Sequence, residues 1–407
     1  MTHLFIQPTD VLVFRDGRPF DAGSDHLASG VFPPPPPTLY GAIRSALLAQ
    51  EGADFATPDF GLTGTAKEVL GTVKEPGLLR IADVALGRAT SDSAAERLYA
   101  PPLDLLARKT SAADAHGDPA YLMTVPQAHP GMQSNLPEGM LLLGPASPHR
   151  IGTFYEGMGE CLLTEKGFAS VLSGTTPEAF TKSLVARKSV FEVERRTSVA
   201  LRAAASKDFT GTAQEGNLFT VEFIRMHHRH GLVVTVDGDD GLLPDTGMLR
   251  LGGEGRPASF SKVSLEPPDS NDIVAERAAI EAQREALVAE VARTGRVKMV
   301  LTTLAPFAHG WRPDGFGDDL RGTLGDAPAR LVSAAVARPA TLGGWDIHHN
   351  CPYPARPAAP AGAVYFFQLD APSDADALFA RIDGNSLFSP DSDEAKKGLG
   401  VVRLGCW

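Results

Sequence analysis

Arginines gather at three places in the sequence where they could bind an anion. Arg15 and Arg18 come just after an apolar stretch, and Arg44 follows a run of five prolines. The segment 182–202 holds six basic residues against two acidic ones, in a chain whose net charge is −11. A guanidinium can form two parallel hydrogen bonds to one phosphate, so this residue type suits a phosphate-bearing partner. Binding depends on the local field, which a negative total charge does not exclude.

Two glycine-rich turns could bring the backbone close to such a partner. One contains Gly252 and Gly253 and ends at Arg256, and the other runs through Gly398 and Gly400. Neither follows a predicted strand and opens a helix, and no GxxxxGK[ST] motif occurs, so neither is typical of a nucleotide-binding loop. Such a turn offers amide donors to a sugar–phosphate backbone. A tight turn that needs positive φ explains the same glycines equally well.

Histidines are the candidates for acid–base or metal chemistry. His26 and His309 could each act as a general base for attack by an RNA 2′-hydroxyl, but neither has a visible partner, and a polar loop residue or a simple RNA contact is favoured for each. The groups at 227–230 and 348–351 resemble metal ligands without an accompanying carboxylate pattern, so a solvated turn is favoured for each. No HExxH or GxSxG motif occurs. We therefore expect neither an enzyme nor a bound cofactor.

The composition is that of a packed globular protein of two or three domains. The chain has 407 residues, of which 43% are hydrophobic. Its three cysteines are far apart and form no CxxC pair, which favours a reducing cytoplasm. No apolar window is long enough for a transmembrane helix, and the first residues lack the pattern of a signal peptide. We therefore expect a cytoplasmic protein without membrane contact.

Hydrophobic periodicity predicts the elements that position the first arginines. Residues 3–14 read as a strand interrupted at Pro8, which indicates an edge or a bulge there. Residues 38–50 read as a helix with Thr38 as its N-cap. The five prolines between them favour a stiff polyproline II spacer. Gly41 inside the helix is unfavourable, and a close approach by a partner would explain it.

The second basic segment is predicted to be a strand. Around Arg195 and Arg196, apolar and charged residues alternate as they do along a half-buried strand. Segments 218–226 and 231–237 read as two strands of a hairpin joined by the histidine-rich turn. A further strand is predicted at 258–263.

The order of these elements predicts an α+β fold built from two similar halves. The first half reads as βαββαβ with the weakly patterned segment 51–182 inserted, and the second half repeats that order. We therefore expect two ferredoxin-like (RRM-like) βαββαβ domains. The expected units are 1–265, a helical linker at 266–295, and 296–407. The second half rests on predicted strands at 297–304, 330–338 and 363–369 and a helix at 375–382, preceded by an amphipathic helix at 271–293.

Several blocks, taken in chain order, resemble a known family. The chain is similar to the third Cmr subunit of type III-B CRISPR effector complexes, within the RAMP superfamily. The resemblance rests on Phe14-Arg-Asp-Gly-Arg-Pro-Phe20, the proline run with Leu39-Tyr-Gly-Ala-Ile-Arg44, Glu194-Arg195 with 212–219, Leu251-Gly-Gly-Glu254, Gly344-Trp-Asp346 with 360–367, and 400–407. Segment 51–182 matches weakly.

This resemblance implies a non-catalytic RNA-binding subunit in antiviral defence. Such a subunit holds the 5′ tag of the CRISPR RNA and joins the large polymerase/cyclase-like subunit to the backbone subunit. Single-stranded RNA ends also stack on aromatic side chains. On this basis the expected RNA-binding residues are Arg15, Arg18, Phe20, His26, Arg44, Arg195, Arg196, Gly252, Gly253 and Arg256.

Two other functions stay open. One is a metal-independent endoribonuclease that processes precursor CRISPR RNA, with His26 or His309 as its base. The other is a purely structural bridge, whose arginines pair with acidic partner subunits.

Overall fold

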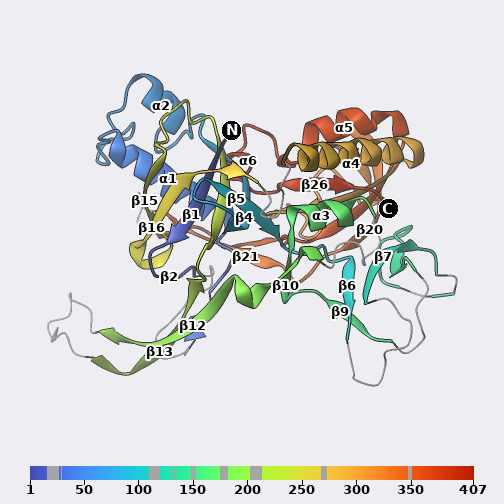
Figure 1. Cartoon of the computed structure of the whole chain (residues 1–407), viewed down its shortest axis with the longest axis horizontal. Helices are drawn as coiled ribbons and strands as arrows, with labels where there is room; N and C mark the ends of the chain where they lie inside the picture. Colours follow the sequence, from blue (N-terminus) through green and yellow to red (C-terminus); the bar gives the residue numbers. More distant parts are fainter. Residues whose placement is uncertain are drawn as a thin grey trace.

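The computed structural model describes residues 1–15, 27–28, 30–109, 120–129, 131–132, 134–147, 153–174, 182–201, 213–266, 273–346 and 351–407. Helices combine with several mostly antiparallel sheets, so the predicted α+β class is confirmed. Two large sheets make up the body, and a long two-stranded arm projects from its first half (Figure 1). None of the described helices is long and apolar enough to cross a membrane.

The first sheet has β1 (Thr2–Pro8) near its centre. β1 pairs with β14 (His230–Asp237) on one side and with β16 (Arg256–Lys262) on the other, both antiparallel. β14 pairs in turn with β4 (Arg80–Ala89), and β15 (Thr246–Leu251) forms the edge beside β16. The central strands therefore lie in the order β16-β1-β14-β4.

Two predictions about strands in this half are wrong. Residues 3–14 do not form one strand with an edge or bulge at Pro8. Instead β1 ends at Pro8, whose nitrogen cannot donate to a ladder, and β2 (Val11–Leu12) joins a different sheet. The strands on either side of the turn at 227–229 are not a hairpin either, because β13 (Ala213–Met226) lies in the sheet of β2 and β14 lies in the first sheet.

Helix α1 (Pro36–Gln50) covers one face of the first sheet. Its Leu39 and Ile43 belong to the same buried cluster as Leu4 and Ile6 of β1. Burial of this apolar stripe holds the helix to the sheet. The short helix α2 (Gly64–Leu70) follows it.

The start of α1 differs from the prediction. The helix begins within the proline run, with Pro35 as its N-cap, and Thr38 lies inside it. Proline suits the first helical positions because their N–H groups have no intrahelical partner anyway. Part of the proline run is therefore helical rather than a spacer. Around Gly41 no described atom of the chain lies within 4 Å of the position a Cβ would take, so packing within the fold does not require this glycine. The approach of a partner stays a prediction.

Segment 51–182, predicted as one insertion, contributes strands to the first sheet. β4 pairs with β14, and β5 (Ala94–Tyr99) extends the sheet beyond β4. A separate four-stranded sheet follows. The remaining elements of this segment are β10 (Cys161–Thr164) and α3 (Glu165–Leu172) around the first sheet, and β6 (Leu105–Arg108), β7 (Tyr121–Gln127), β8 (Leu142–Pro145) and β9 (Tyr155–Gly157) in the separate sheet. Outside the segment, the first sheet is completed by β11 (Leu184–Ala186), which is followed by η2 (Arg187–Ser189), and by β17 (Ser264–Leu265).

The arm is formed by β12 (Phe191–Leu201) and β13. Near the body, β13 also pairs with β2 and with β3 (Leu27–Ala28), which gives the arm base four strands. Two strands alone are marginally stable in water, so the extra pairings support the arm where it leaves the body.

The second sheet has the strand order β19-β20-β25-β18-β26. Side chains alternate between two buried faces of its central strands: Val297 and Met299 of β18 lie in one cluster, and Val300 lies in another with Phe366 of β25. Helices α4 and α5 lie over the face of Val297 (Figure 1). The bounds are β18 (Arg296–Leu301), β19 (Arg321–Leu324), β20 (Ala327–Ala335), β25 (Val364–Leu369), β26 (Val402–Gly405), α4 (Ile273–Thr294) and α5 (Ala375–Ile382).

Short elements complete the second half. Two small ribbons connect β20 to β25, and a short helix precedes β26. Their bounds are β21 (Ala340–Leu342), β22 (Trp345–Asp346), β23 (Cys351–Pro352), β24 (Arg356–Ala358), η4 (Pro372–Asp374) and α6 (Asp393–Lys396).

A buried ion pair joins the two halves. Lys298 of β18 places its Nζ 2.9 Å from Oδ2 of Asp104 and donates to the carbonyl of Val171, and both charged side chains are 1% exposed. An apolar cluster that mixes residues of α3, β5 and β25 surrounds this pair. The region between β4 and β14 is thereby fixed against the face of the second sheet that carries Val300 and Phe366, on the side away from α4 and α5.

Candidate nucleic-acid interface

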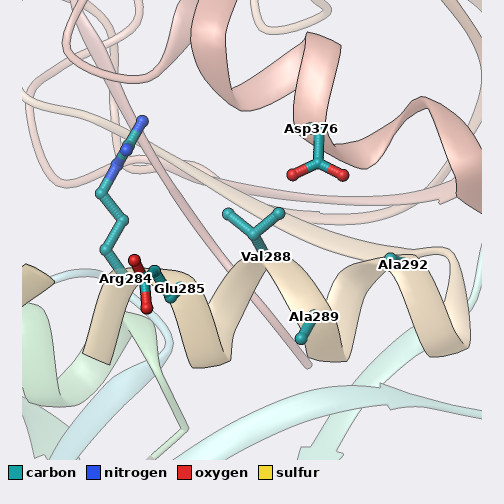
Figure 2. Close-up of a pocket in the computed structure, with 6 residues that line it drawn as sticks. All are labelled: Arg284, Glu285, Val288, Ala289, Ala292 and Asp376. Carbon is teal, nitrogen blue, oxygen red and sulfur yellow. The ribbon is translucent and has the colours of Figure 1, made fainter. Parts of the chain in front are cut away.

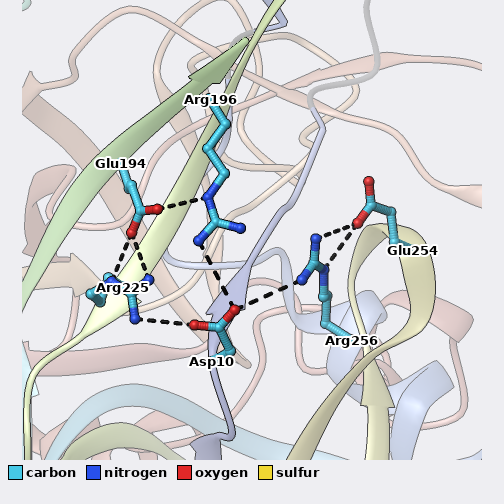
Figure 3. A network of polar contacts seen from close by, with 6 residues as sticks. All are labelled: Asp10, Glu194, Arg196, Arg225, Glu254 and Arg256. Carbon is cyan, nitrogen blue, oxygen red and sulfur yellow. Dashed lines mark hydrogen bonds and ion pairs between the residues drawn. The ribbon is translucent and has the colours of Figure 1, made fainter. Parts of the chain in front are cut away.

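Three arginines and three carboxylates meet where the arm leaves the body (Figure 3). We call this group the arm-base cluster. It lies outside the apolar cores, with side chains that are between a quarter and three fifths exposed. Its members are Asp10, Glu194, Arg196, Arg225, Glu254 and Arg256.

Backbone geometry explains why these residues converge. The break between β1 and β2 places Asp10 where the chain passes from the first sheet to the arm sheet. Successive side chains of a strand alternate, so Glu194 and Arg196 of β12 share one face. In the register of the hairpin, Glu192 lies opposite Arg225, which puts Arg225 on that same face. Arg256 opens β16, next to the turn that follows β15.

Asp10 and Glu194 hold the arginines together. Glu194 accepts from Nε of Arg196 at 2.6 Å and from Nε of Arg225 at 2.7 Å. Asp10 accepts from Arg225 at 3.1 Å and lies 4.0 Å from Arg196 and 3.9 Å from Arg256. Glu254 accepts from Nε and NH2 of Arg256 at 3.0 and 2.5 Å. Three guanidinium groups are thus kept close together, each beside at least one carboxylate.

The buried ring of Phe223 supports two of these arginines. The guanidinium carbons of Arg196 and Arg256 lie 5.0 and 5.2 Å from its ring centre. The ring is 3% exposed and packs with Val11 and Val13 of the β2 region. A cation over an aromatic face is attracted by the ring quadrupole, so Phe223 orients both groups independently of the carboxylates.

The charges of the cluster shift one another's ionisation. Hydrogen bonds from Arg225 and then Arg196 hold the pKa of Glu194 below its ordinary value. Hydrogen bonds to Glu194 and Asp10 raise the pKa of Arg225. Both groups are therefore charged at neutral pH, and the cluster is a set of ion pairs.

The predicted residue Arg195 lies at the other face of the arm, and Arg15 lies near its partner Glu222. Arg195 donates through Nε and NH2 to Oε1 of Glu222, at 3.2 and 3.0 Å, on the strand opposite. Oε2 of Glu222 accepts from the amide of Gly30, and Gly30 forms a β-bridge with Arg15. Arg15 is exposed there. The arm base thus presents arginines on both of its faces.

Arg44 has a different position from the one predicted. Its Nε and NH2 donate to the carbonyls of Leu70 and Thr72 at 2.7 and 2.8 Å, and its guanidinium lies 5.2 Å from the ring centre of Phe60. Burial lowers the pKa of Arg44. This side chain ties α1 to the last residue of α2 and to the segment after it. The remaining predicted residues Arg18, Phe20 and His26 lie outside the described part of the chain.

The turn at Gly252 and Gly253 packs against the β2 region. Gly252 has φ of +71°, and a Cβ there would lie 2.4 Å from the carbonyl oxygen of Val13. The amide of Gly253 donates to that same carbonyl at 2.7 Å. Gly252 is therefore required for a close backbone contact that holds the turn beside the arm base.

The glycines near the C-terminus serve packing in the same way. A Cβ on Gly400 would lie 2.6 Å from the ring of Phe388, and one on Gly398 would lie 2.8 Å from Ile81. The second glycine-rich turn is thus enclosed by side chains of this chain. A tight turn with positive φ, one of the two interpretations from the sequence, therefore accounts for Gly398 and Gly400.

Sequence reasoning missed Asp10, Arg225 and Glu254. Arg225 had a usable signal, because it falls on the same face of a predicted strand as Val221 and Phe223. Glu254 lies inside the predicted glycine-rich turn that ends at Arg256, so its place beside that arginine was within reach of the sequence. Asp10 had no signal, since only the folded chain brings it to residues more than 180 positions away.

The described histidines form no metal site. His227 and His230 each contact a backbone carbonyl, of Lys188 and of His228. His309 is exposed and forms a β-bridge with Arg312. Within the described ranges, no three His, Cys, Asp or Glu residues are placed to hold a metal ion. The group at 348–351 lies largely outside those ranges.

Two other pockets on the described surface have few charged groups that could bind a ligand. One of about 280 Å³ lies between α4 and α5, where small aliphatic side chains of α4 face Asp376 (Figure 2). Its lining consists of Arg284, Glu285, Val288, Ala289, Ala292 and Asp376. A wider cleft of about 720 Å³ lies between the two halves and includes Arg80, Arg381 and three phenylalanines. The guanidinium groups of Arg80 and Arg381 are already paired with Asp237 and Asp326.

Fold and interface together define an α+β protein with clustered arginines at the base of a projecting arm. A family model described as CRISPR-associated protein (Cas_Cmr3) matches residues 4–389. The chain therefore belongs to the Cas_Cmr3 family of CRISPR-associated proteins.

Comparisons with individual proteins give weaker similarities. No curated protein sequence matches the chain. A chain from the cryo-EM structure of the type III-B Cmr-beta bound to cognate target RNA is 12% identical, with a TM-score of 0.44 over 89% of this chain and 86% of that chain. A chain from the same assembly bound to cognate target RNA and AMPPnP, state 1, is also 12% identical, with a TM-score of 0.40 and the same coverage.

Proposed function

We propose that this chain is the RNA-binding subunit of a type III-B CRISPR effector complex. In this role it holds the 5′ tag of the CRISPR RNA and bridges the large polymerase/cyclase-like subunit to the backbone subunit. Its membership of the Cas_Cmr3 family supports a place in a CRISPR assembly. The subunit acts as a scaffold and does not itself cleave RNA.

The arm-base cluster is the observation that carries the proposal. Arg196, Arg225 and Arg256 come from three separate segments, and Phe223 and two carboxylates hold them in fixed positions. A fixed guanidinium loses little freedom on binding a phosphate, and its fork can engage two phosphate oxygens. Arg195 extends the contact to the opposite face, with Arg15 exposed near by, so the RNA backbone crosses the arm base.

The strand order supports two ferredoxin-like domains. Such a domain has its four strands in the spatial order 4-1-3-2, with neighbours antiparallel. β1, β4, β14 and β16 take those four places in the first half, and β18, β20, β25 and β26 take them in the second. The domains span 1–265 and 296–407, with α4 between them in sequence. In the first, β4 takes the place of a domain strand, so only the part of segment 51–182 that follows β4 lies between two domain strands, β4 and β14.

The proposal is tested with the full chain and a single-stranded RNA that carries the repeat-derived 5′ tag. Arg225→Gln combined with Arg256→Gln should weaken binding and reduce the magnitude of the salt slope by about 0.7 for each lost phosphate contact. Arg293→Gln is the matched control, because Arg293 is an exposed arginine on α4 that is also paired with a glutamate. Equal affinity of the double variant and this control would reject the RNA site.

A structural bridge is the second candidate, and the ion pairs favour it. Each arginine of the arm-base cluster already has a carboxylate partner, so an acidic partner subunit could replace those carboxylates. In that case the double variant would lose assembly with the other Cmr subunits and keep its affinity for the tag RNA.

Incubation with repeat RNA in the absence of metal tests the endoribonuclease: specific cleavage lost in His26→Ala or His309→Ala would establish it.

A further inference from the structure

We propose that Glu254 occupies the phosphate position on Arg256 in the RNA-free protein and is displaced when RNA binds. This inference rests on the proposed RNA-binding function and assigns a new role within that interface. Glu254 would act as a built-in competitor that sets the affinity of the arm base for an RNA backbone.

The three carboxylates of the arm-base cluster differ in how firmly they are held. Glu194 bonds two arginines and its side chain is 31% exposed, and Asp10 contacts three arginines and is 49% exposed. Glu254 is 60% exposed and, among the described residues, pairs with Arg256 alone. Asp10 and Glu194 therefore build the cluster, while Glu254 only covers one of its arginines.

The contact between Glu254 and Arg256 uses the groups that a phosphate would use. Nε and NH2 of Arg256 both donate to Oε2 of Glu254. These two N–H groups form one side of the guanidinium fork, which matches the spacing of two phosphate oxygens. An exposed carboxylate pair of this kind is weak in water, so an incoming phosphate can replace it.

Arg256 stays in place without Glu254. Its guanidinium lies over the ring of Phe223 and 3.9 Å from Asp10 on the side of the cluster. Removal of the Glu254 carboxylate therefore leaves an oriented arginine whose outer donors are open. Because the arginine keeps its orientation and gains free donors, loss of the neighbouring carboxylate strengthens anion binding.

The backbone at Glu254 indicates that its position is imposed by the turn. Glu254 has φ of +61°, in the left-handed region that a glutamate rarely adopts, between Gly253 and Gly255. The bond from the amide of Gly253 to the carbonyl of Val13 fixes the turn. A strained residue at a binding surface points to a function for that residue, here the placement of a carboxylate over Arg256.

The test compares Glu→Gln substitutions in the full chain, because each removes one charge and keeps the size of the side chain. Glu254→Gln should raise the affinity for the tag RNA by about two- to fivefold and increase the magnitude of the salt slope by about 0.7. Glu290→Gln is the control for net charge, because Glu290 forms a similar exposed pair with Arg293 on α4. Glu194→Gln should instead weaken binding, since that carboxylate assembles the cluster.

Arg256 must be the residue through which Glu254 acts. In an Arg256→Gln background, the gain from Glu254→Gln should disappear. Affinity of Glu254→Gln equal to or below that of Glu290→Gln would overturn the inference. If Arg225→Gln still weakens RNA binding in that case, the proposed function stands. If the wild-type chain shows no salt-dependent binding of the tag RNA, both proposals fail.

Discussion

Arg195 and Arg196 are adjacent in sequence but lie on opposite faces of the β12–β13 arm. Arg195 pairs with Glu222 on the strand opposite, whereas Arg196 pairs with Glu194 and contacts the ring of Phe223. The alternation of side chains along a strand makes this division unavoidable. The two arginines therefore belong to separate charge groups, although the sequence presents them as one basic patch.

This separation predicts how substitutions at the arm base combine. Arg195→Gln and Arg196→Gln share no partner, so their effects on RNA affinity should multiply within about twofold. Arg196→Gln and Arg225→Gln share Glu194 and Asp10. Loss of either arginine changes the environment of the other, so that pair should deviate clearly from a product. Two double-mutant cycles on the tag RNA give the measurement. Equal coupling in both cycles would contradict the division into two faces.

A second prediction concerns the buried pair of Lys298 and Asp104. Lys298→Met leaves the Asp104 carboxylate buried without its partner, and should destabilise the chain by about 3–5 kcal/mol. Thermal unfolding of the full chain measures the loss, with Arg293→Gln as the exposed-pair control. Lys298→Met combined with Asp104→Leu should recover part of the stability, because no uncompensated charge remains. A loss in Lys298→Met no greater than in the control would show that the pair contributes little.

Local periodicity predicts helices of this chain closely. The helix expected at 375–382 has those bounds in the structure, and the one expected at 271–293 spans Ile273–Thr294. Strand 363–369 is also confirmed within one residue, since β25 spans Val364–Leu369. In each case, the residues that bury the element lie within it, so the sequence window contains the necessary information.

Local sequence patterns do not show which distant strands pair with one another. Segments 218–226 and 231–237 each have strand character, yet they enter different sheets because β1 and β2 separate at Pro8. The separation of β1 from β2 also places Asp10 beside Arg225 and Arg256. Arg44 is a basic residue that instead serves the fold. Nothing in its helical window indicates that the carbonyls of Leu70, at the end of α2, and Thr72 accept its hydrogen bonds. The strand topology therefore decides which residues form the arm-base cluster. The basic segment in the sequence does not show which carboxylates and arginines will join it.

A third prediction follows from the position of Arg44. Arg44→Gln removes charge-assisted bonds to the carbonyls of Leu70 and Thr72, so it should destabilise the chain by about 1–3 kcal/mol. The salt slope of RNA binding should stay unchanged, because this guanidinium is occupied within the protein. Denaturant unfolding and a salt titration of RNA affinity test the two halves of this prediction. A reduced salt slope with unchanged stability would instead place Arg44 in the RNA interface.

The fourth prediction uses the ionisation of Glu194. Hydrogen bonds from Arg225 and Arg196 lower its pKa in the folded chain, so its ionised form stabilises the fold. That contribution is complete above the pKa of the unfolded chain, about 4.3, and disappears as the pH falls through the lower folded value. Wild type should therefore be more stable than Glu194→Gln at neutral pH, and the two should converge in acid.

Urea midpoints of both proteins across this pH range provide the measurement. The control is Glu290→Gln, which also removes a glutamate whose pKa is lowered by an arginine, but on α4. Both variants should converge with wild type in acid, because each loses a single depressed carboxylate. Only Glu194→Gln should also lose RNA affinity at neutral pH, where Glu194 holds two arginines in position. A Glu194→Gln variant that stays less stable than wild type at the lowest pH would mean that this side chain stabilises the arm base through packing rather than through its charge.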